Sequence, residues 1–189
     1  MLNINKTLAI LAGGKSSRMN FNNKAFLTYK EKAFIEHIIE AGKSFENIII
    51  VANNEEEYNK LNIRIIKDIY VGNGPISGIH SALVHSETEE VLCIACDMPL
   101  ISKNTLEALG KIDEEYDVLV PKVNDRLQPL CSIYSKKLLK PLEIALMNGD
   151  NRLQNLIFRL NYKEVHEINF KEKEFLNINT PNDYKRLEE

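Results

Sequence analysis

The sequence predicts an α/β protein with three layers, in which helices cover both faces of a mostly parallel central sheet. Short β-branched runs alternate along the chain with segments of helical periodicity, a pattern typical of strands joined by helical connections. The run of residues 91–95 is apolar throughout, as expected of a central strand that is buried on both faces. No repeat, low-complexity tract or linker divides the 189 residues, so we expect one domain over residues 1–189.

The first half of the chain contains the core of the predicted sheet. Its expected strands lie at residues 7–11, 48–51, 63–66 and 91–95. A helix is expected near residues 32–43, where four apolar residues share one face: Phe34, Ile35, Ile38 and Ile39. A further helix begins at Pro75, because proline suits a first helical turn and the apolar residues that follow have helical spacing.

The second half continues the alternation. Its expected strands lie at residues 118–120, 130–134, 164–168 and 175–178. Ser102 is a suitable N-cap for the next helix. Helices are also expected around residues 138–147, interrupted or restarted by Pro141, around residues 152–160, and after Pro181.

The overall charge and hydropathy exclude several classes of protein. A net charge of -3 argues against a general nucleic-acid-binding protein, which needs a broad cationic face. No apolar run approaches the roughly 20 residues that cross a bilayer, so no membrane association is expected. Residues 1–30 contain five cations and no acid, but their apolar run and paired glycines indicate a folded core rather than a presequence.

The three cysteines indicate neither a disulfide framework nor a metal site. Cys93 and Cys96 have the spacing of half a zinc site, yet both belong to an apolar run that is typical of a buried strand. No second pair of ligands completes the set. We therefore expect buried cysteines and a cytoplasmic location.

A glycine-rich, basic segment follows the first predicted strand and indicates a phosphate-binding site. It consists of Leu11-Ala12-Gly13-Gly14-Lys15-Ser16-Ser17-Arg18, with Lys24 shortly after it. Paired glycines let phosphates approach backbone N–H groups, although glycines alone also fit a tight turn. Three cations within ten residues, with no acid to pair them, favour a bound anion over a simple turn. The spacing matches neither a P-loop nor the dinucleotide fingerprint.

Two aspartates follow other predicted strands, at the edge where ligands of parallel sheets gather. Asp97 comes after the central strand, and a carboxylate there would be repelled by bound phosphates unless Mg²⁺ bridged them. The alternative is that Asp97 caps the turn toward Pro99. Asp68, after the third strand, could hold a ribose hydroxyl, a base edge or its own loop. Gly74 and Gly78 would admit a flat ring near the backbone.

The sequence resembles the molybdenum cofactor guanylyltransferase (MobA) family over essentially its whole length. Five segments carry the likeness in order: LAILAGGKSSRMNFNNKAFL, KDIYVGNGPISGIHSAL, CIACDMPLIS, LQPLCSIYSKKLL and FLNINTPNDY. The chain departs from the family pattern at Asn23, where an aspartate is usual, and at Ser77, where alanine is common. At the position of a nucleotide-contacting asparagine it has Val51, with Asn53 two residues on.

The resemblance implies a Rossmann-like nucleotidyltransferase fold and a set of site residues. Leu11, Ala12, Gly13, Gly14 and Lys24 would line GTP, with Asp68 at the guanosine and Lys15, Asn53 and Gly78 as further candidates. Arg18, Lys24 and Asp97 would be catalytic, and Asp97 would be the Mg²⁺ ligand.

The implied reaction is the transfer of GMP from GTP to the terminal phosphate of molybdenum-molybdopterin, with release of pyrophosphate. Other proteins of the cofactor pathway or of molybdoenzyme maturation are possible transient partners. Alternatives are a molybdopterin cytidylyltransferase, another sugar-phosphate-type nucleotidyltransferase and a non-catalytic GTP-binding protein. The cytidylyltransferases typically read L-A-A-G where this chain has Leu11-Ala12-Gly13-Gly14. The second glycine leaves room for a purine close to the backbone, which favours guanine.

Overall fold

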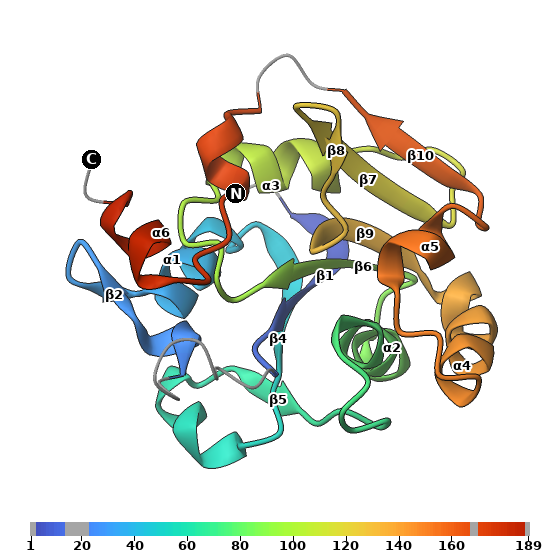
Figure 1. Cartoon of the computed structure of the whole chain (residues 1–189), viewed down its shortest axis with the longest axis horizontal. Helices are drawn as coiled ribbons and strands as arrows, with labels where there is room; N and C mark the ends of the chain where they lie inside the picture. The colour runs from blue at the N-terminus through green and yellow to red at the C-terminus, as the bar shows by residue number, and fades with distance from the viewer. Residues whose placement is uncertain (1–2, 14–22, 167–169, 188–189) are drawn as a thin grey trace.

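A central sheet with helices on both faces organises the chain, as the computed structural model shows for residues 3–13, 23–166 and 170–187 (Figure 1). The strand order is β10-β7-β9-β6-β1-β4-β5, with β8 paired to β7. The strands of this sheet are β1 (Ile4–Leu11), β4 (Phe45–Val51), β5 (Arg64–Ile66), β6 (Glu90–Ala95), β7 (Val118–Val123), β8 (Arg126–Leu127), β9 (Cys131–Ser135) and β10 (Tyr162–Val165). The central position predicted for residues 91–95 is confirmed, because β6 lies in the middle of this order.

The sheet is mostly parallel, as predicted. β1 pairs in parallel with both β4 and β6, β4 with β5, and β7 with β10. β9 runs antiparallel to β6 and to β7, and β8 forms a hairpin with β7. The periodicity of the sequence did not indicate these reversals, because the apolar run of β9 is the same in either direction.

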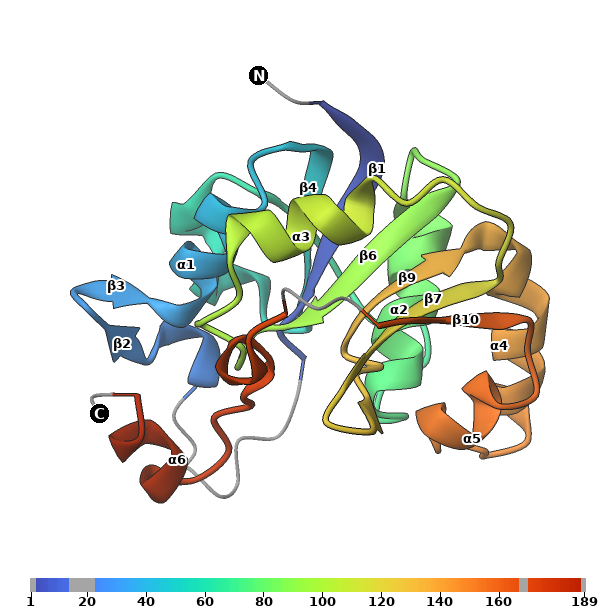
Figure 2. The same ribbon diagram turned by 90° about the horizontal axis from the view of Figure 1, so that it is seen from above.

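Helices of the two faces pack on alternate residues of the same strands. The helices are α1 (Phe34–Ala41), α2 (Pro75–His85), α3 (Lys103–Gly110), α4 (Leu139–Met147), α5 (Leu153–Ile157) and α6 (Pro181–Lys185). Leu8 and Ile10 of β1 belong to the cluster with α1 and α3, whereas Ala9 belongs to the cluster with α2, α4 and α5. This two-residue alternation is what a strand covered on both faces requires. Figure 2 shows the two helical layers on either side of the sheet at β6.

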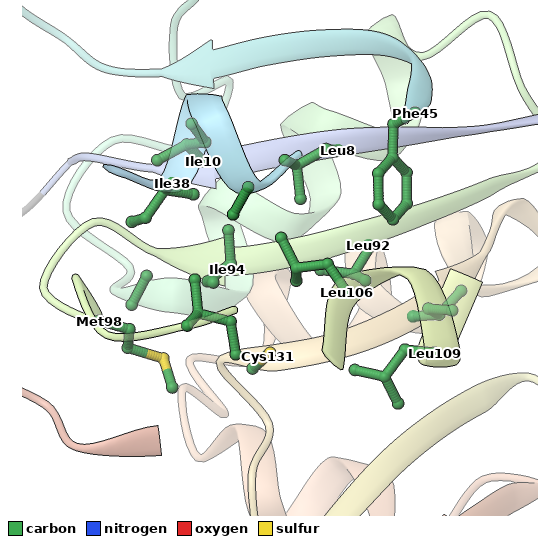
Figure 3. Packing of buried hydrophobic residues seen from close by; sticks show 14 of the residues in the cluster. Leu8, Ile10, Ile38, Phe45, Leu92, Ile94, Met98, Leu106, Leu109 and Cys131 are labelled. Atoms are coloured by element: carbon green, nitrogen blue, oxygen red, sulfur yellow. The ribbon is translucent and has the colours of Figure 1, made fainter. Parts of the chain in front are cut away.

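The core beneath α1 and α3 is made mostly of close-packed aliphatic side chains, with Phe45, Met98 and Cys131 among them (Figure 3). Leu8, Ile10, Ile38, Leu92 and Leu106 are all fully buried there. Each such side chain contributes roughly 1.5–3 kcal/mol through removal of its apolar surface from water. This packing fixes the position of the end of β1 relative to the end of β6.

Two predicted boundaries are confirmed by their local chemistry. Pro75 begins α2, and Ser102 caps α3 by accepting a hydrogen bond from the N–H of Thr105 at 3.2 Å. Pro141 does not interrupt α4, because it lies in the first turn, where its missing N–H is not needed. A small hairpin of β2 (Thr28–Tyr29) and β3 (Lys32–Ala33), which we did not predict, precedes α1.

Three other predictions need correction. The strand at 175–178 is wrong: a 3-10 turn, η6 (Glu172–Phe175), comes first, and Phe175 and Ile178 pack into different core clusters. The helix at 152–160 is shorter, since α5 covers only Leu153–Ile157. The strand predicted at 164–168 corresponds to β10, which begins earlier, at Tyr162, and ends at Val165. Residues 167 and 168 of the predicted strand lie outside the described part of the chain. None of the described helices has the length and apolarity to span a membrane.

Candidate functional site

A cleft opens at the carboxyl ends of the adjacent parallel strands β1 and β6. Backbone pairing continues past the strands: Ala12 N–H donates to the Val51 carbonyl at 2.9 Å, and Cys96 N–H to the Leu11 carbonyl at 3.1 Å. Ligands of parallel α/β sheets bind at such an edge. The described residues that line the cleft are Leu11, Ala12, Gly13, Asn23, Lys24, Pro75, Ala95, Cys96, Asp97 and Leu130.

Lys24 reaches the cleft from a single 3-10 turn, η2 (Lys24–Phe26). Asn23 begins this turn, and its Oδ1 accepts a hydrogen bond from the N–H of Ala25 at 3.1 Å. The Lys24 ammonium lies 3.3 Å from Oδ2 of Asp97 and donates a hydrogen bond to Oδ1 of Asn179 at 2.5 Å. Three distant segments of the chain therefore meet at one amine.

Asp97 directly follows β6 and presents a largely buried carboxylate. Its side chain is 15% exposed, and burial raises its pKa, an effect that the neighbouring Lys24 opposes. Oδ1 of Asp97 is buried and has no hydrogen-bond partner among the residues that the structure describes. The main chain of Asp97 is held in place, because its carbonyl accepts a hydrogen bond from the N–H of Ile178 at 2.9 Å.

The unpartnered oxygen of Asp97 fits a divalent cation that a substrate brings with it. Within the described residues, no group of three or more His, Cys, Asp or Glu side chains could hold a metal ion by itself. Mg²⁺ is commonly bound by one or two carboxylates together with substrate phosphates, so a single carboxylate is compatible with it. Asp97 could hold such an ion through its Oδ1.

Asp68 and Asn53 form a second polar group at the neighbouring strand ends. The Asn53 side chain donates to Oδ2 of Asp68 at 2.9 Å, and the N–H of Asp68 donates back to Oδ1 of Asn53 at 3.1 Å. The other oxygen of Asp68, Oδ1, is buried without a partner in the described part of the chain. A Cβ placed on Gly13 would lie 3.4 Å from Oδ2 of Asp68, and one on Gly78 would lie 3.7 Å from its Oδ1.

These contacts bring together four of the residues predicted to line the nucleotide: Gly13, Asn53, Asp68 and Gly78. Gly74, the other glycine expected to admit a flat ring, does not border Asp68, because a Cβ placed on it meets no atom within 4 Å. Side chains are absent on both glycines, so the carboxylate of Asp68 lies beside open backbone. A planar group with donor hydrogens could bind the free Oδ1 there.

The model of the MobA-like NTP transferase domain matches residues 8–165, from within β1 to the end of β10, and this range includes Lys24, Asp97, Asn53 and Asp68. The chain belongs to the MobA-like NTP transferase family. The expected family resemblance is thereby confirmed, and members of this family are nucleotidyltransferases.

Curated and solved relatives support the same assignment. A probable molybdenum cofactor guanylyltransferase of Clostridium perfringens strain 13 is 50% identical over 97% of this chain and 96% of that protein. One from Carboxydothermus hydrogenoformans is 35% identical, with 97% and 95% covered. The crystal structure of molybdopterin-guanine dinucleotide biosynthesis protein A from Archaeoglobus fulgidus is similar with a TM-score of 0.82, at 30% identity and 96% coverage of both chains. The predicted nucleotidyltransferase fold is confirmed.

For this nucleotidyltransferase, the structure groups most of the predicted site residues. Leu11, Ala12, Gly13, Lys24 and Asp97 line one cleft. The predicted residues Gly14, Lys15 and Arg18 lie outside the described part of the chain.

Asn179 contacts Lys24 in the cleft, and it was not identified from the sequence as a site residue. It belongs to the segment after η6, where the sequence suggested a strand and a helix start but no functional side chain. A signal was present, because an asparagine just before Thr180-Pro181 lies next to a helix N-terminus. Its partner could not be read from sequence, since Lys24 is 155 positions away.

The cysteines behave as the apolar pattern predicted. Cys93 and Cys131 are buried, Cys96 is partly buried, and all three are free thiols. Burial raises the pKa of the Cys96 thiol to about 12, with the nearby Asp97 carboxylate acting in the same direction. A neutral thiol is a poor nucleophile and a poor metal ligand.

Proposed function

We propose that this chain transfers GMP from GTP to the terminal phosphate of molybdenum-molybdopterin, giving the guanine dinucleotide cofactor and pyrophosphate. The observation that carries the proposal is the meeting of Lys24, Asp97 and Asn179 at the strand ends of a MobA-like domain. The names of its relatives support the choice of substrates, since two of them are probable molybdenum cofactor guanylyltransferases.

Lys24 would bind the triphosphate of GTP. Its ammonium supplies positive charge at a partly buried point, where electrostatic stabilisation is stronger than in water. In the free protein this charge is balanced by Asp97 at 3.3 Å. The amide oxygen of Asn179 holds the amine from the other side, so Lys24 is oriented before a substrate arrives.

Asp97 would hold Mg²⁺ through its Oδ1, which is buried and unpartnered among the described residues. When bound, Mg²⁺ would neutralise phosphate charge and act as a Lewis acid. The contribution of the chain is to keep the carboxylate at the end of β6, fixed by the backbone bond from Ile178.

Asp68 would select the base. Its free Oδ1 can accept hydrogen bonds from the donor edge of guanine, while Asn53 occupies Oδ2. Gly13 and Gly78 border this carboxylate without side chains of their own, so neither residue places a Cβ beside it. Cytosine presents an acceptor between its donor and its carbonyl, and it fits a carboxylate less well.

The transfer needs no general base from the protein. A phosphate monoester has its second pKa at about 6, so the acceptor phosphate is mostly a dianion at neutral pH. Its oxygen attacks the α-phosphorus of GTP, and the bond to pyrophosphate breaks. This agrees with the described residues that line the cleft, among which there is no histidine.

A thermal-shift comparison of GTP, CTP, ATP and UTP with Mg²⁺ tests the nucleotide. A ligand at a hundredfold excess over its Kd stabilises a protein by about 2.7 kcal/mol, or roughly 5–10 °C for a domain of this size. We expect the largest shift with GTP. Pyrophosphate release that depends on both GTP and molybdenum-molybdopterin tests the acceptor. Release with CTP in preference to GTP would contradict the proposal.

A further inference from the structure

Tyr58 joins two sides of the cleft through a hydroxyl that the proposed chemistry does not use. It lies between the 3-10 turns η3 (Glu55–Glu57) and η4 (Asn59–Leu61), and it is 1% exposed. Its ring packs against Phe26 with the centroids 5.1 Å apart. The hydroxyl accepts a hydrogen bond from the Asn23 amide at 2.8 Å and donates one to the Ala12 carbonyl at 3.3 Å.

The donors and acceptors of this network allow only one assignment of donor and acceptor to each hydrogen bond. Glu57 is a carboxylate that can only accept, so the Asn23 amide nitrogen must face it, and Oδ1 of Asn23 is left to accept from Ala25. The second hydrogen of the same nitrogen goes to the Tyr58 oxygen. The Tyr58 proton is then free for Ala12. Burial raises the pKa of Tyr58, so this proton stays in place.

We propose that Tyr58 is a positioning residue that fixes Lys24 relative to the end of β1, through its hydrogen bonds to Asn23 and Ala12. Asn23 immediately precedes Lys24 and caps the turn that carries it, and Ala12 is the first residue after β1. The proposal rests on the proposed function in one respect, that Lys24 binds the nucleotide.

Asn23 and Glu57 are matched to one another in this network. An aspartate at position 23 would place a second carboxylate against Glu57, at a point where the two side chains now lie 2.5 Å apart. Two close carboxylates repel, and neither can donate a hydrogen bond. An aspartate could also accept the hydrogen bond that the Tyr58 hydroxyl now donates, so the Ala12 carbonyl would lose its donor. The amide of Asn23 is therefore favoured over a carboxylate while Glu57 lies beside it.

The first experiment removes only the hydroxyl, with Tyr58→Phe, and measures chemical labelling of lysines without nucleotide. Lys24 is 18% exposed and held by two partners, so it should react slowly with an amine reagent in the original protein. We expect the Tyr58→Phe variant to label at Lys24 at least about twice as fast, because one hydrogen bond is worth a factor of this order. Lys6, which is buried far from the cleft, should not change.

The matched control is Tyr116→Phe. Tyr116 is also a buried tyrosine, 3% exposed, and its hydroxyl has no hydrogen-bond partner within the described residues. We expect this variant to label and to bind GTP like the original protein. Tyr58→Phe should bind GTP roughly three- to tenfold more weakly, the effect of one lost hydrogen bond. Unchanged Lys24 labelling and GTP affinity in Tyr58→Phe would overturn the proposal.

A second experiment uses a double-mutant cycle, which also applies if Tyr58→Phe folds poorly. Glu57→Gln should bind GTP within about twofold of the original, because its amide oxygen still accepts from Asn23. Asn23→Asp should bind more weakly. The double variant should bind GTP at least about threefold more tightly than Asn23→Asp alone. The reason is that the side-chain amide introduced at position 57 can donate a hydrogen bond to the new carboxylate. Simple addition of the two single effects would overturn the matching of Asn23 to Glu57, from which the direction of the Tyr58 hydrogen bonds follows.

These measurements separate the positioning role from the proposed function. An original protein that binds none of the four nucleotides would overturn the function, while the labelling rate of Lys24 still tests the role of Tyr58. GTP binding by the original protein, with equal labelling and equal affinity in Tyr58→Phe, would overturn the positioning role alone.

Discussion

The ammonium of Lys24 lies 3.3 Å from Oδ2 of Asp97, although 73 positions separate the two residues. Each side chain is largely buried, 18% and 15% exposed, so each charge is compensated by the other in the free protein. Oδ1 of Asp97 is left without a partner among the described residues. A cation on this oxygen and phosphates on the lysine would satisfy both groups at once.

Asp97→Asn should abolish most of the transfer activity. The amide keeps the shape of the side chain but removes the charge that would hold a divalent cation. By analogy with the loss of one electrostatic stabiliser, we expect kcat to fall roughly a hundredfold or more, about 3 kcal/mol. Steady-state pyrophosphate release at saturating Mg²⁺ measures this. Asp117→Asn is the control, because Asp117 accepts its hydrogen bond from Asn161 outside the cleft. Near-normal turnover of Asp97→Asn would contradict a metal role.

Asp68→Asn should weaken the binding of GTP more than that of CTP. The substitution puts an amide where the free Oδ1 could accept from guanine, while a bond to Asn53 remains possible. Hydrogen bonds to a charged group are worth about 1.5–3 kcal/mol, so we expect the Kd for GTP to rise at least about tenfold. Calorimetric titration with both nucleotides measures the change. Asp125→Asn, in an exposed turn, should leave both affinities unchanged. Equal GTP affinity in Asp68→Asn would exclude this carboxylate from base recognition.

Asp183→Asn should lower the melting temperature at neutral pH but not in acid. Oδ2 of Asp183 accepts hydrogen bonds from the Thr180 hydroxyl and from the N–H groups of Thr180 and Asn179. These bonds, the one from the Thr180 side chain first, hold the pKa of Asp183 below its ordinary value of 3.8.

The sign of this pH dependence follows from the lowered pKa. The unfolded chain binds the proton more tightly, so the stabilisation by Asp183 is fully present above pH 3.8 and is lost as the pH falls through the folded-state pKa. The difference in melting temperature between the original protein and Asp183→Asn should shrink in that window. A difference independent of pH would show that the charge does not matter.

Ser77→Ala should stabilise the protein. Ser77 is fully buried in α2, and its hydroxyl has no hydrogen-bond partner in the described part of the chain. Replacing an unsatisfied buried hydroxyl by hydrogen should raise the free energy of unfolding by about 1 kcal/mol, or roughly 2–4 °C. Urea unfolding measures it.

Ser81→Ala is the matched control for this change. Ser81 is fully buried in the same helix, but its hydroxyl accepts a hydrogen bond from the N–H of Ile69 at 2.9 Å. Its removal leaves that N–H without a partner, so we expect a loss of about 1–3 kcal/mol. The opposite signs of the two variants are the prediction, and equal effects would refute it.

Local patterns predicted most elements of the fold, because they depend on residues close together in sequence. The apolar run that became β6, the proline that begins α2 and the serine that caps α3 each act within a few residues. The failure at 175–178 has the same origin. Phe175 and Ile178 are buried as their apolarity indicated, but in two separate clusters rather than in a strand.

The sequence by itself determined that glycines, a lysine and aspartates would follow parallel strands at one edge of an α/β sheet. It also predicted the burial that the structure shows for Cys93 and Cys131. Only the tertiary structure decided that Lys24 would meet Asp97 and Asn179, that Asn53 would pair with Asp68, and that β9 would run against its neighbours. The physical reason is that these contacts depend on strand order and on packing between distant segments, whereas propensity and periodicity act over a few residues.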